Sequence, residues 1–196
     1  ALAQLGEDVI ALLDHLNIDK ALFCGISMGG LTGLWLARFA PERFYAVAVA
    51  NTAARIGDQS GWLSRARAVR QEGMDVVAAG AADRWFSDAF RQRAPEVVEA
   101  LCHQLTHSDA EGYAACCEAL AAADLRGEVG QIAIPVLIIA GESDPVTTVA
   151  DANFLHQQIA TSQVVVLKAS HLSNIEAPAA FNAALNGFLL GEQNGR

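Results

Sequence analysis

The sequence has 196 residues, of which 53% are hydrophobic and only 18% are charged. A chain of this length and composition can bury one substantial core and is not typical of disordered proteins. Its formal net charge of −9 argues against nucleic acid or an anionic membrane as a partner, because both bind basic surfaces. Neither a signal peptide nor an apolar run long enough to span a bilayer is visible, and we therefore expect a cytoplasmic location.

The four cysteines have the spacing of neither a metal site nor a disulfide scaffold. Cys24 lies in an apolar run and is expected to be a buried small hydrophobe. Cys102 stands alone, whereas Cys116 and Cys117 are adjacent. These features predict a reduced protein without a bound metal.

The chain alternates between strand-like and helix-like segments. Short apolar runs predict buried strands over residues 20–25, 45–51, 135–141 and 163–167. Apolar residues at helical spacing predict helices over residues 3–16, 29–39 and 177–190. This alternation is typical of the α/β class, with a mostly parallel sheet and helices on both of its faces.

The pattern changes between the second and the third predicted strand. Residues 60–128 are rich in alanine, arginine, glutamate and aromatic residues at helical spacing, and they contain no strand-like run. We predict that they form a helical cap inserted into the α/β core. The core then consists of residues 1–59 and 129–196.

The strongest local signal is the segment Gly25-Ile26-Ser27-Met28-Gly29, which follows a predicted strand and opens a predicted helix. A G-x-S-x-G pattern in this context is typical of the nucleophile elbow of the α/β-hydrolase fold. The sharp turn exposes the Ser27 hydroxyl. We expect the flanking glycines to avoid clashes where strand and helix meet, and Gly30 to allow close packing of the helix. The alternative is a Gly-Ser turn without chemical meaning.

A nucleophilic serine needs a base, and the base needs an orienting carboxylate. Asp144 follows the third predicted strand and His171 follows the fourth, so both lie where ligands meet an open α/β sheet. The order serine, acid, histidine is that of the α/β-hydrolases. Glu142 is the nearest rival acid, and a plain turn residue before Pro145 is the alternative role for Asp144. The remaining histidines lie in predicted helices or in the cap, at His15, His103, His107 and His156.

These residues predict acyl transfer that requires neither a cofactor nor a metal. His171 would take the Ser27 proton while Asp144 holds the imidazole in the correct tautomer. The backbone N–H of Met28, at a helix N-terminus, is the expected donor to an oxyanion. Water activated by His171 would then release the acyl group. The expected partner is therefore a small-molecule ester or lactone.

Ser27 lies close to the first residue of the sequence. Hydrolases of this fold build several strands before the elbow, together with the loop that supplies a second oxyanion donor. Residues 1–26 contain no counterpart of that loop or of those strands. We therefore expect that an N-terminal part of the natural protein is missing from this sequence.

Several longer stretches are more particular than the elbow, which many hydrolases share. They read F-C-G-I-S-M-G-G-L at 23–31, P-E-R-F at 41–44, A-N-T-A-A-R-I-G at 50–57, R-W-F at 84–86, E-G-Y-A-A-C-C-E-A-L at 111–120, A-D-L-R at 123–126 and A-S-H-L-S-N-I-E-A-P at 169–178. Together they resemble the 3-oxoadipate enol-lactonases over nearly the whole chain. Only the sequence around the acid, G-E-S-D-P-V-T, departs from the most usual pattern of this family, and it keeps the aspartate.

The resemblance implies hydrolysis of 3-oxoadipate enol-lactone to 3-oxoadipate, in the β-ketoadipate pathway of bacterial aromatic catabolism. It also implies that Ser27, Asp144 and His171 are the catalytic triad. These are the same three residues that the elbow and the strand ends indicate.

The implied substrate carries a free carboxylate, and a cation or several donors should lie near its pocket. Arg55 follows the second predicted strand at its carboxyl end, and Arg84 lies beside Trp85 in the cap. We predict that one of these arginines binds the carboxylate and that Trp85 shapes an apolar wall. The alternatives are an ion pair of Arg55 with an acid such as Asp58, and plain packing of Trp85 and Phe86 against the sheet.

Other functions remain open at this point. A general esterase, a perhydrolase and a carbon–carbon bond hydrolase share the same triad, so only a comparison of substrates separates them. A haloalkane dehalogenase would have aspartate in place of Ser27. A hydrolase-like binding protein would hold a ligand and turn it over slowly, and the intact triad argues against that alternative.

Overall fold

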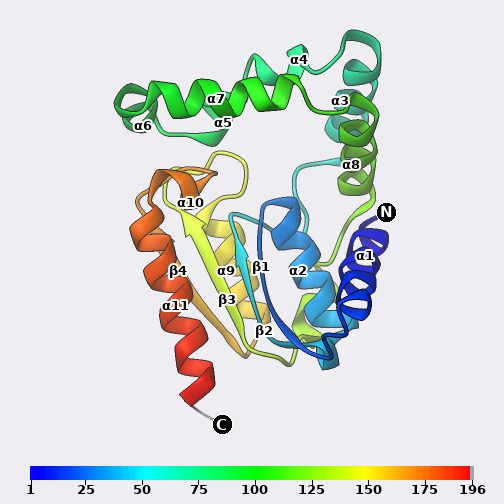
Figure 1. The fold of residues 1–196 in the computed structure, drawn as a ribbon, viewed down its shortest axis with the longest axis vertical. Coiled ribbons are helices and arrows are strands. Elements are labelled where there is room, and N and C mark those ends of the chain that lie inside the picture. The colour runs from blue at the N-terminus through cyan, green and yellow to red at the C-terminus, as the bar shows by residue number, and fades with distance from the viewer. Residues whose placement is uncertain (195–196) are drawn as a thin grey trace.

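The computed structural model of the chain describes residues 1–194. Four parallel strands form a sheet between two layers of helices (Figure 1). The strands neighbour one another in the order in which they occur in the sequence, namely β1 (Ala21–Ile26), β2 (Phe44–Ala50), β3 (Val136–Gly141) and β4 (Ser162–Leu167). The predicted α/β class is therefore confirmed, and each observed strand begins and ends within one residue of the prediction.

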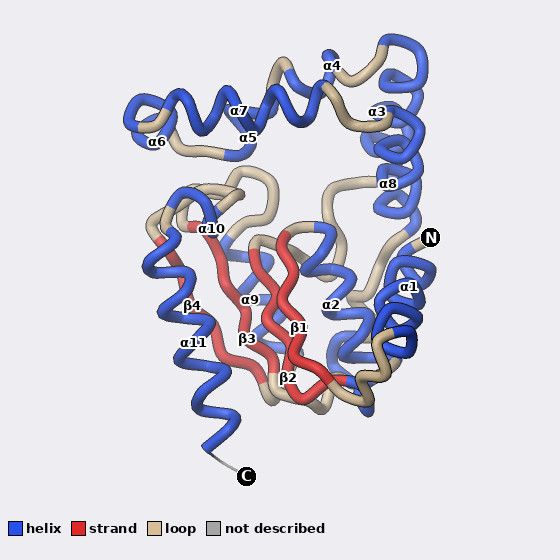
Figure 2. Tube along the Cα trace, in the orientation of Figure 1, coloured by secondary structure: helices blue, strands red, loops and turns tan. Residues whose placement is uncertain are grey.

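Helices cover both faces of the sheet, as Figure 2 shows by colour. Successive side chains of a strand point to opposite faces, so β2 and β3 contribute to two separate cores. Val47 and Ile138 pack against α1 (Leu2–His15), α2 (Met28–Phe39) and α9 (Val149–Gln158). Ala48 and Ile139 pack on the other face with Phe181 of α11 (Pro178–Asn194), which follows the short helix α10 (Ser173–Glu176).

Strand β1 departs from the prediction of a buried strand. Its side chains alternate between half-buried and exposed, and Leu22 and Cys24 are among the exposed ones. Helix α11 crosses β2, β3 and β4 on this face of the sheet, so it does not shield the outward-facing residues of β1. The expectation that Cys24 is buried was therefore wrong, because covering a strand depends on its neighbours as well as on its own apolar residues.

The helices between β2 and β3 lie beyond the carboxyl ends of the strands (Figure 1). We call them the cap helices: α3 (Gln59–Glu72), α4 (Asp75–Ala78), α5 (Ala81–Trp85), α6 (Asp88–Arg93), α7 (Pro95–Thr106) and α8 (Ala110–Ala122). Asp58 and Asp109 cap the first turns of α3 and α8, which pack against each other. The all-helical character agrees with the sequence pattern, while the division into a core and a cap at residues 60 and 128 stays a prediction.

Candidate active site

Ser27 lies at the turn between β1 and α2 with φ 55° and ψ −117°. A positive φ is rare for a residue with a side chain, and the surrounding structure must supply the free energy that it costs. The Ser27 N–H donates to the carbonyl of Ala50 at 2.9 Å, which ties the turn to the neighbouring strand β2. The Ser27 hydroxyl therefore projects from the sheet at the carboxyl end of β1.

The glycines around Ser27 are present for different reasons. A Cβ on Gly25 would lie 2.2 Å from the carbonyl oxygen of Gly29, and one on Gly30 would lie 2.8 Å from the Cβ of Thr52. Both positions are thus too close to neighbouring atoms for a side chain. A Cβ on Gly29 would meet no described atom within 4 Å. The expectation of a clash is therefore correct for Gly25 and Gly30 and wrong for Gly29, which faces open space.

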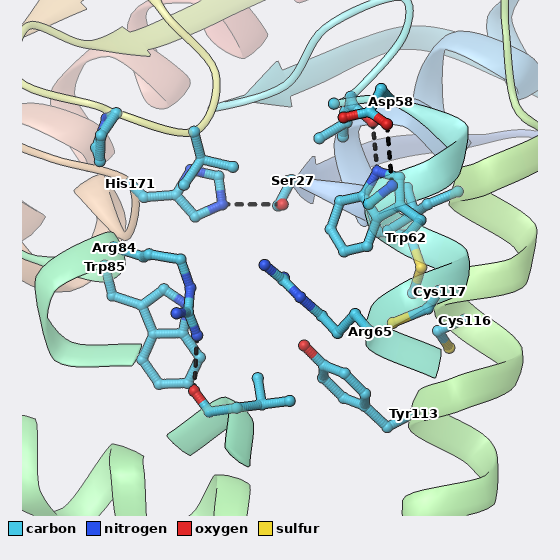
Figure 3. Close-up of a pocket in the computed structure, with 18 residues that line it drawn as sticks. Ser27, Asp58, Trp62, Arg65, Arg84, Trp85, Tyr113, Cys116, Cys117 and His171 are labelled. Carbon is cyan, nitrogen blue, oxygen red and sulfur yellow. Dashed lines mark hydrogen bonds between the residues drawn. The ribbon is translucent and has the colours of Figure 1, made fainter. Parts of the chain in front are cut away.

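Ser27, His171 and Asp144 form a continuous hydrogen-bonded chain at this edge of the sheet. Nε2 of His171 lies 2.9 Å from Oγ of Ser27 (Figure 3), and Nδ1 lies 2.8 Å from Oδ2 of Asp144. An ionised carboxylate can only accept hydrogen bonds, so Nδ1 donates to Asp144 and Nε2 can accept the Ser27 proton. The rival acid Glu142 is exposed. The structure thus brings together the three side chains that the sequence singles out.

The carboxylate of Asp144 is buried and surrounded by donors. The N–H groups of Val146 and Thr147 donate to Oδ1 at 2.8 and 3.1 Å, while the Thr147 hydroxyl and the Asn51 amide donate to Oδ2, each at 2.9 Å. Burial alone would raise the pKa of Asp144. The hydrogen bond and charge of His171, joined by the bonds from Asn51 and Thr147, outweigh burial and hold that pKa below its ordinary value. The acid therefore stays ionised and can stabilise a protonated His171.

Asn51 supports the acid, although the sequence did not identify it as a site residue. It directly follows β2 with φ 45°, a conformation that asparagine tolerates better than most residues. Its amide donates to Asp144 and to the carbonyl of Ser170 at 3.1 Å, and its oxygen accepts from the Ser173 hydroxyl at 2.5 Å. Its position after a buried strand was the available signal, and the same signal identifies Asp144.

Glu176 is a second supporting residue that was not predicted. It holds the histidine loop, which we define as residues 168–172. Its buried carboxylate accepts from the N–H of Ser170 at 3.1 Å, from the N–H of Ser87 at 3.2 Å and from the Ser87 hydroxyl. Ser87 caps α6, and close by the Leu172 N–H donates to the carbonyl of Trp85 at 3.0 Å. The cap helices are therefore anchored to the histidine loop.

A cavity of about 520 Å³ lies next to Ser27 and His171, between the sheet edge and the cap helices. This volume lies in the range of small-molecule sites. Met28 lines the cavity, and as the first residue of α2 it has an N–H without an acceptor inside the helix. That N–H is suited to an oxyanion formed next to Ser27.

The three predicted substrate-binding residues do not all lie at the cavity. Arg84 and Trp85 line the cavity, whereas Arg55 is absent from its wall. The reason lies in the backbone after β2, where the carbonyl of Ala54 accepts from the N–H of Leu125 at 2.8 Å. This pairing brings the Arg55 guanidinium to 3.8 Å from Asp124, away from the cavity. Arg55 is therefore not part of the site proposed below.

Arg65 is a charged cavity residue that the sequence analysis did not single out. It lies on α3, and Figure 3 shows its side chain extending below Ser27 and His171. Its guanidinium carbon lies 4.8 Å from the ring centroid of Trp62, and Tyr113 of α8 also lines the cavity. In the sequence Arg65 is one of several arginines on a polar helix, so nothing there separates it from Arg67 or Arg70.

Two other kinds of feature are not found in the part of the chain that the structure describes. No group of three or more histidine, cysteine, aspartate or glutamate residues within residues 1–194 could hold a metal ion. Over the same residues, no helix is long and apolar enough to cross a membrane. The cytoplasmic location stays a prediction.

The parallel sheet, the strained serine turn and the serine–histidine–aspartate chain are those of an α/β-hydrolase. The sequence profile of the alpha/beta hydrolase fold family matches residues 1–178. The chain therefore belongs to the α/β-hydrolase fold family.

Individual relatives narrow this similarity. The chain is 58% identical over 186 residues to 3-oxoadipate enol-lactonase 2 of Acinetobacter baylyi, covering 95% of the chain and 70% of the relative. It is 49% identical over 188 residues to enol-lactonase 1 of the same organism, covering 96% and 71%. Among solved structures, the enol-lactonase from Burkholderia xenovorans LB400 matches with a TM-score of 0.95 and 45% identity, covering 97% of this chain and 73% of that one. The predicted resemblance and the prediction of a carboxylic ester hydrolase are thus confirmed.

Proposed function

We propose that the chain hydrolyses 3-oxoadipate enol-lactone to 3-oxoadipate, with Ser27 as the nucleophile, His171 as general base and acid, and Asp144 as the orienting acid. The observation that carries this proposal is the unbroken Ser27–His171–Asp144 chain at the floor of a cavity of small-molecule size. The similarity to the enol-lactonases of A. baylyi and B. xenovorans supports the choice of substrate.

Acylation begins when Ser27 Oγ attacks the lactone carbonyl and passes its proton to Nε2 of His171. The N–H of Met28 stabilises the oxyanion, and the ionised Asp144 stabilises the imidazolium. The ring C–O bond then breaks and the enolate oxygen leaves, taking the proton from His171. Because the ester is cyclic, this leaving group stays attached to the acyl chain and becomes a ketone by tautomerisation.

Deacylation uses the same residues in the reverse direction. His171 removes a proton from a water molecule, which attacks the ester bond to Ser27. The bond from the acyl carbon to Ser27 Oγ breaks, the serine recovers its proton from His171, and the product leaves with a second carboxylate. Only an ester or a lactone is required for these steps, so the cavity wall decides which one reacts fastest.

The test is kcat/KM of the full-length protein for 3-oxoadipate enol-lactone and for a neutral ester, with Ser27→Ala as the control. We expect the lactone to be preferred by orders of magnitude and Ser27→Ala to lose about 10⁶-fold in kcat, as in other serine hydrolases. A preference for the neutral ester would instead indicate a general esterase of the same fold. Retained activity in Ser27→Ala would overturn the mechanism itself.

A further inference from the structure

Two arginines bring positive charge into the cavity. Arg65 enters from α3 and Arg84 from α5, and both line the space next to Ser27. Among the described side chains, neither guanidinium has a carboxylate oxygen within 4.0 Å, whereas Arg38 and Arg70 each form ion pairs. A cavity that gathers two cations and no neutralising partner favours an anionic ligand.

The electrostatic cost of this arrangement is visible at Arg84. Burial lowers the pKa of its guanidinium, and the positive charge of Arg65 lowers that pKa further. The chain as a whole carries a formal net charge of −9, so the global field repels anions. An anion in the cavity must therefore be attracted locally, by these two side chains.

The cavity wall contains one carboxylate, but it is occupied elsewhere. Asp58 caps α3, where it accepts from the N–H of Gly61 at 2.9 Å and from the hydroxyl of Ser60 at 2.6 Å. These bonds lower the pKa of Asp58, with the Ser60 hydroxyl as the largest cause, so it remains an ionised helix cap. It does not neutralise Arg65.

The two guanidinium groups are held in different ways. Arg84 donates to the carbonyl of Val77 at 2.7 Å, which turns its charge toward the backbone of the cap helices. Arg65 instead makes a cation–π contact with Trp62 and extends into the cavity beside Ser27 and His171, below them in the view of Figure 3. The Tyr113 side chain also bonds Arg65, but a neutral phenol does not cancel the charge. A guanidinium has five N–H donors, so a carboxylate can still bind Arg65 with two parallel bonds. Arg65 is therefore the better placed of the two.

We infer that Arg65 binds the free carboxylate of the substrate while the lactone carbonyl lies at Ser27, and that Arg84 adds a second positive charge behind it. This inference rests on the proposed function and makes it more specific. It assigns to Arg65 the selection of acyl chains that end in an anion. The dicarboxylate product would keep the same contact, since hydrolysis does not change the carboxylate that the substrate already carries.

The first experiment compares the carboxylated enol-lactone with a neutral γ-lactone that lacks the carboxylate. In Arg65→Gln we expect the ratio of the two kcat/KM values to fall about 10- to 100-fold, through KM of the carboxylated substrate, since one charged bidentate contact is lost. Arg65→Lys should recover part of this ratio. Arg67→Gln is the matched control, because Arg67 is exposed on the same helix and does not line the cavity. An unchanged ratio in Arg65→Gln would overturn the inference.

The second experiment separates this inference from the proposed function. Adipate, a dicarboxylate of similar length, is added while turnover of the neutral γ-lactone is followed. Competitive inhibition by adipate that weakens at least 10-fold in Arg65→Gln, but not in Arg67→Gln, supports the carboxylate site whatever the natural substrate is. Inhibition that is equal in both variants refutes it. In a third outcome, the wild type shows no preference for the carboxylated lactone while inhibition by adipate still requires Arg65. That result would refute the proposed substrate and support the carboxylate site.

Discussion

Glu176 offers a direct test of how the cap helices and the histidine loop are held together. Its carboxylate accepts three hydrogen bonds, one from Ser170 and two from Ser87. In Glu176→Ala the buried N–H of Ser170 and the half-buried N–H of Ser87 lose their acceptor, at about 1–3 kcal/mol each. We therefore expect the free energy of unfolding to fall by about 2–5 kcal/mol.

Glu176→Gln should cost less. The amide keeps one acceptor oxygen, and the Ser87 hydroxyl can rotate to accept from the new NH₂ group. The main change is the loss of the negative charge. Each hydrogen bond to the side chain then falls from about 1.5–3 kcal/mol to about 1 kcal/mol, and the lower cost of burying a neutral amide offsets part of this loss. A net loss of about 1–3 kcal/mol follows, measured by urea denaturation.

Kinetics then distinguish the two ends of this contact. Ser87→Ala removes a bond to the cap helices but leaves the bond to Ser170, next to His171, in place. We expect Glu176→Ala to lower kcat about 10- to 100-fold through a misplaced imidazole, and Ser87→Ala to leave kcat within about 3-fold. Equal losses of kcat in both variants would refute the positioning role. So would a Glu176→Ala protein whose unfolding free energy lies within about 0.5 kcal/mol of the wild type.

Other substitutions test the elbow and the acid. Asp144→Asn should lower kcat about 10⁴-fold, because an amide can hold the imidazole in the wrong tautomer. The folded-state pKa of Asp144 lies below its unfolded value, so ionised Asp144 stabilises the fold. The difference in unfolding free energy between the wild type and Asp144→Asn should therefore be largest above about pH 5 and should shrink as the pH falls through the folded pKa. Denaturation at stepped pH measures this difference. Gly25→Ala should destabilise the protein by more than about 2 kcal/mol, because its Cβ would meet backbone at 2.2 Å. Gly29→Ala, whose Cβ enters open space in the first turn of a helix, should be neutral or slightly stabilising; urea denaturation measures both glycine variants.

The strands could be located from the sequence because buried parallel strands are continuous apolar runs. Their ends agree with the prediction to within a residue for that reason. The burial of β1 could not be predicted in the same way. Whether Cys24 meets a helix or solvent depends on where α11 crosses the sheet, and the β1 sequence contains no information on that.

The same division applies to the site. Ser27, Asp144 and His171 each follow a strand, so the topology of a parallel sheet brings them to one edge before any distance is known. Glu176 and Ser87 are 89 residues apart in the sequence, and only the packed cap helices bring them together. The two arginines show most clearly what sequence position cannot predict. Arg55 follows a strand end, as the catalytic residues do, yet it lies near Asp124, whereas Arg65 lies in the middle of a polar helix and lines the cavity.

In the proposed mechanism, catalysis and substrate choice depend on different parts of the chain. Ser27, Asp144 and His171 each follow a strand at the same edge of the sheet, where hydrogen bonds join them. The cap helices supply Arg65 and most of the cavity wall, and they hold the histidine loop through the contact of Ser87 with Glu176 and through the bond from the Leu172 N–H to the Trp85 carbonyl. A substitution at Arg65 should accordingly act on KM of anionic substrates, whereas one at Glu176 should act on kcat for every substrate. If both variants changed the same kinetic constant, the two segments would have to act as one unit.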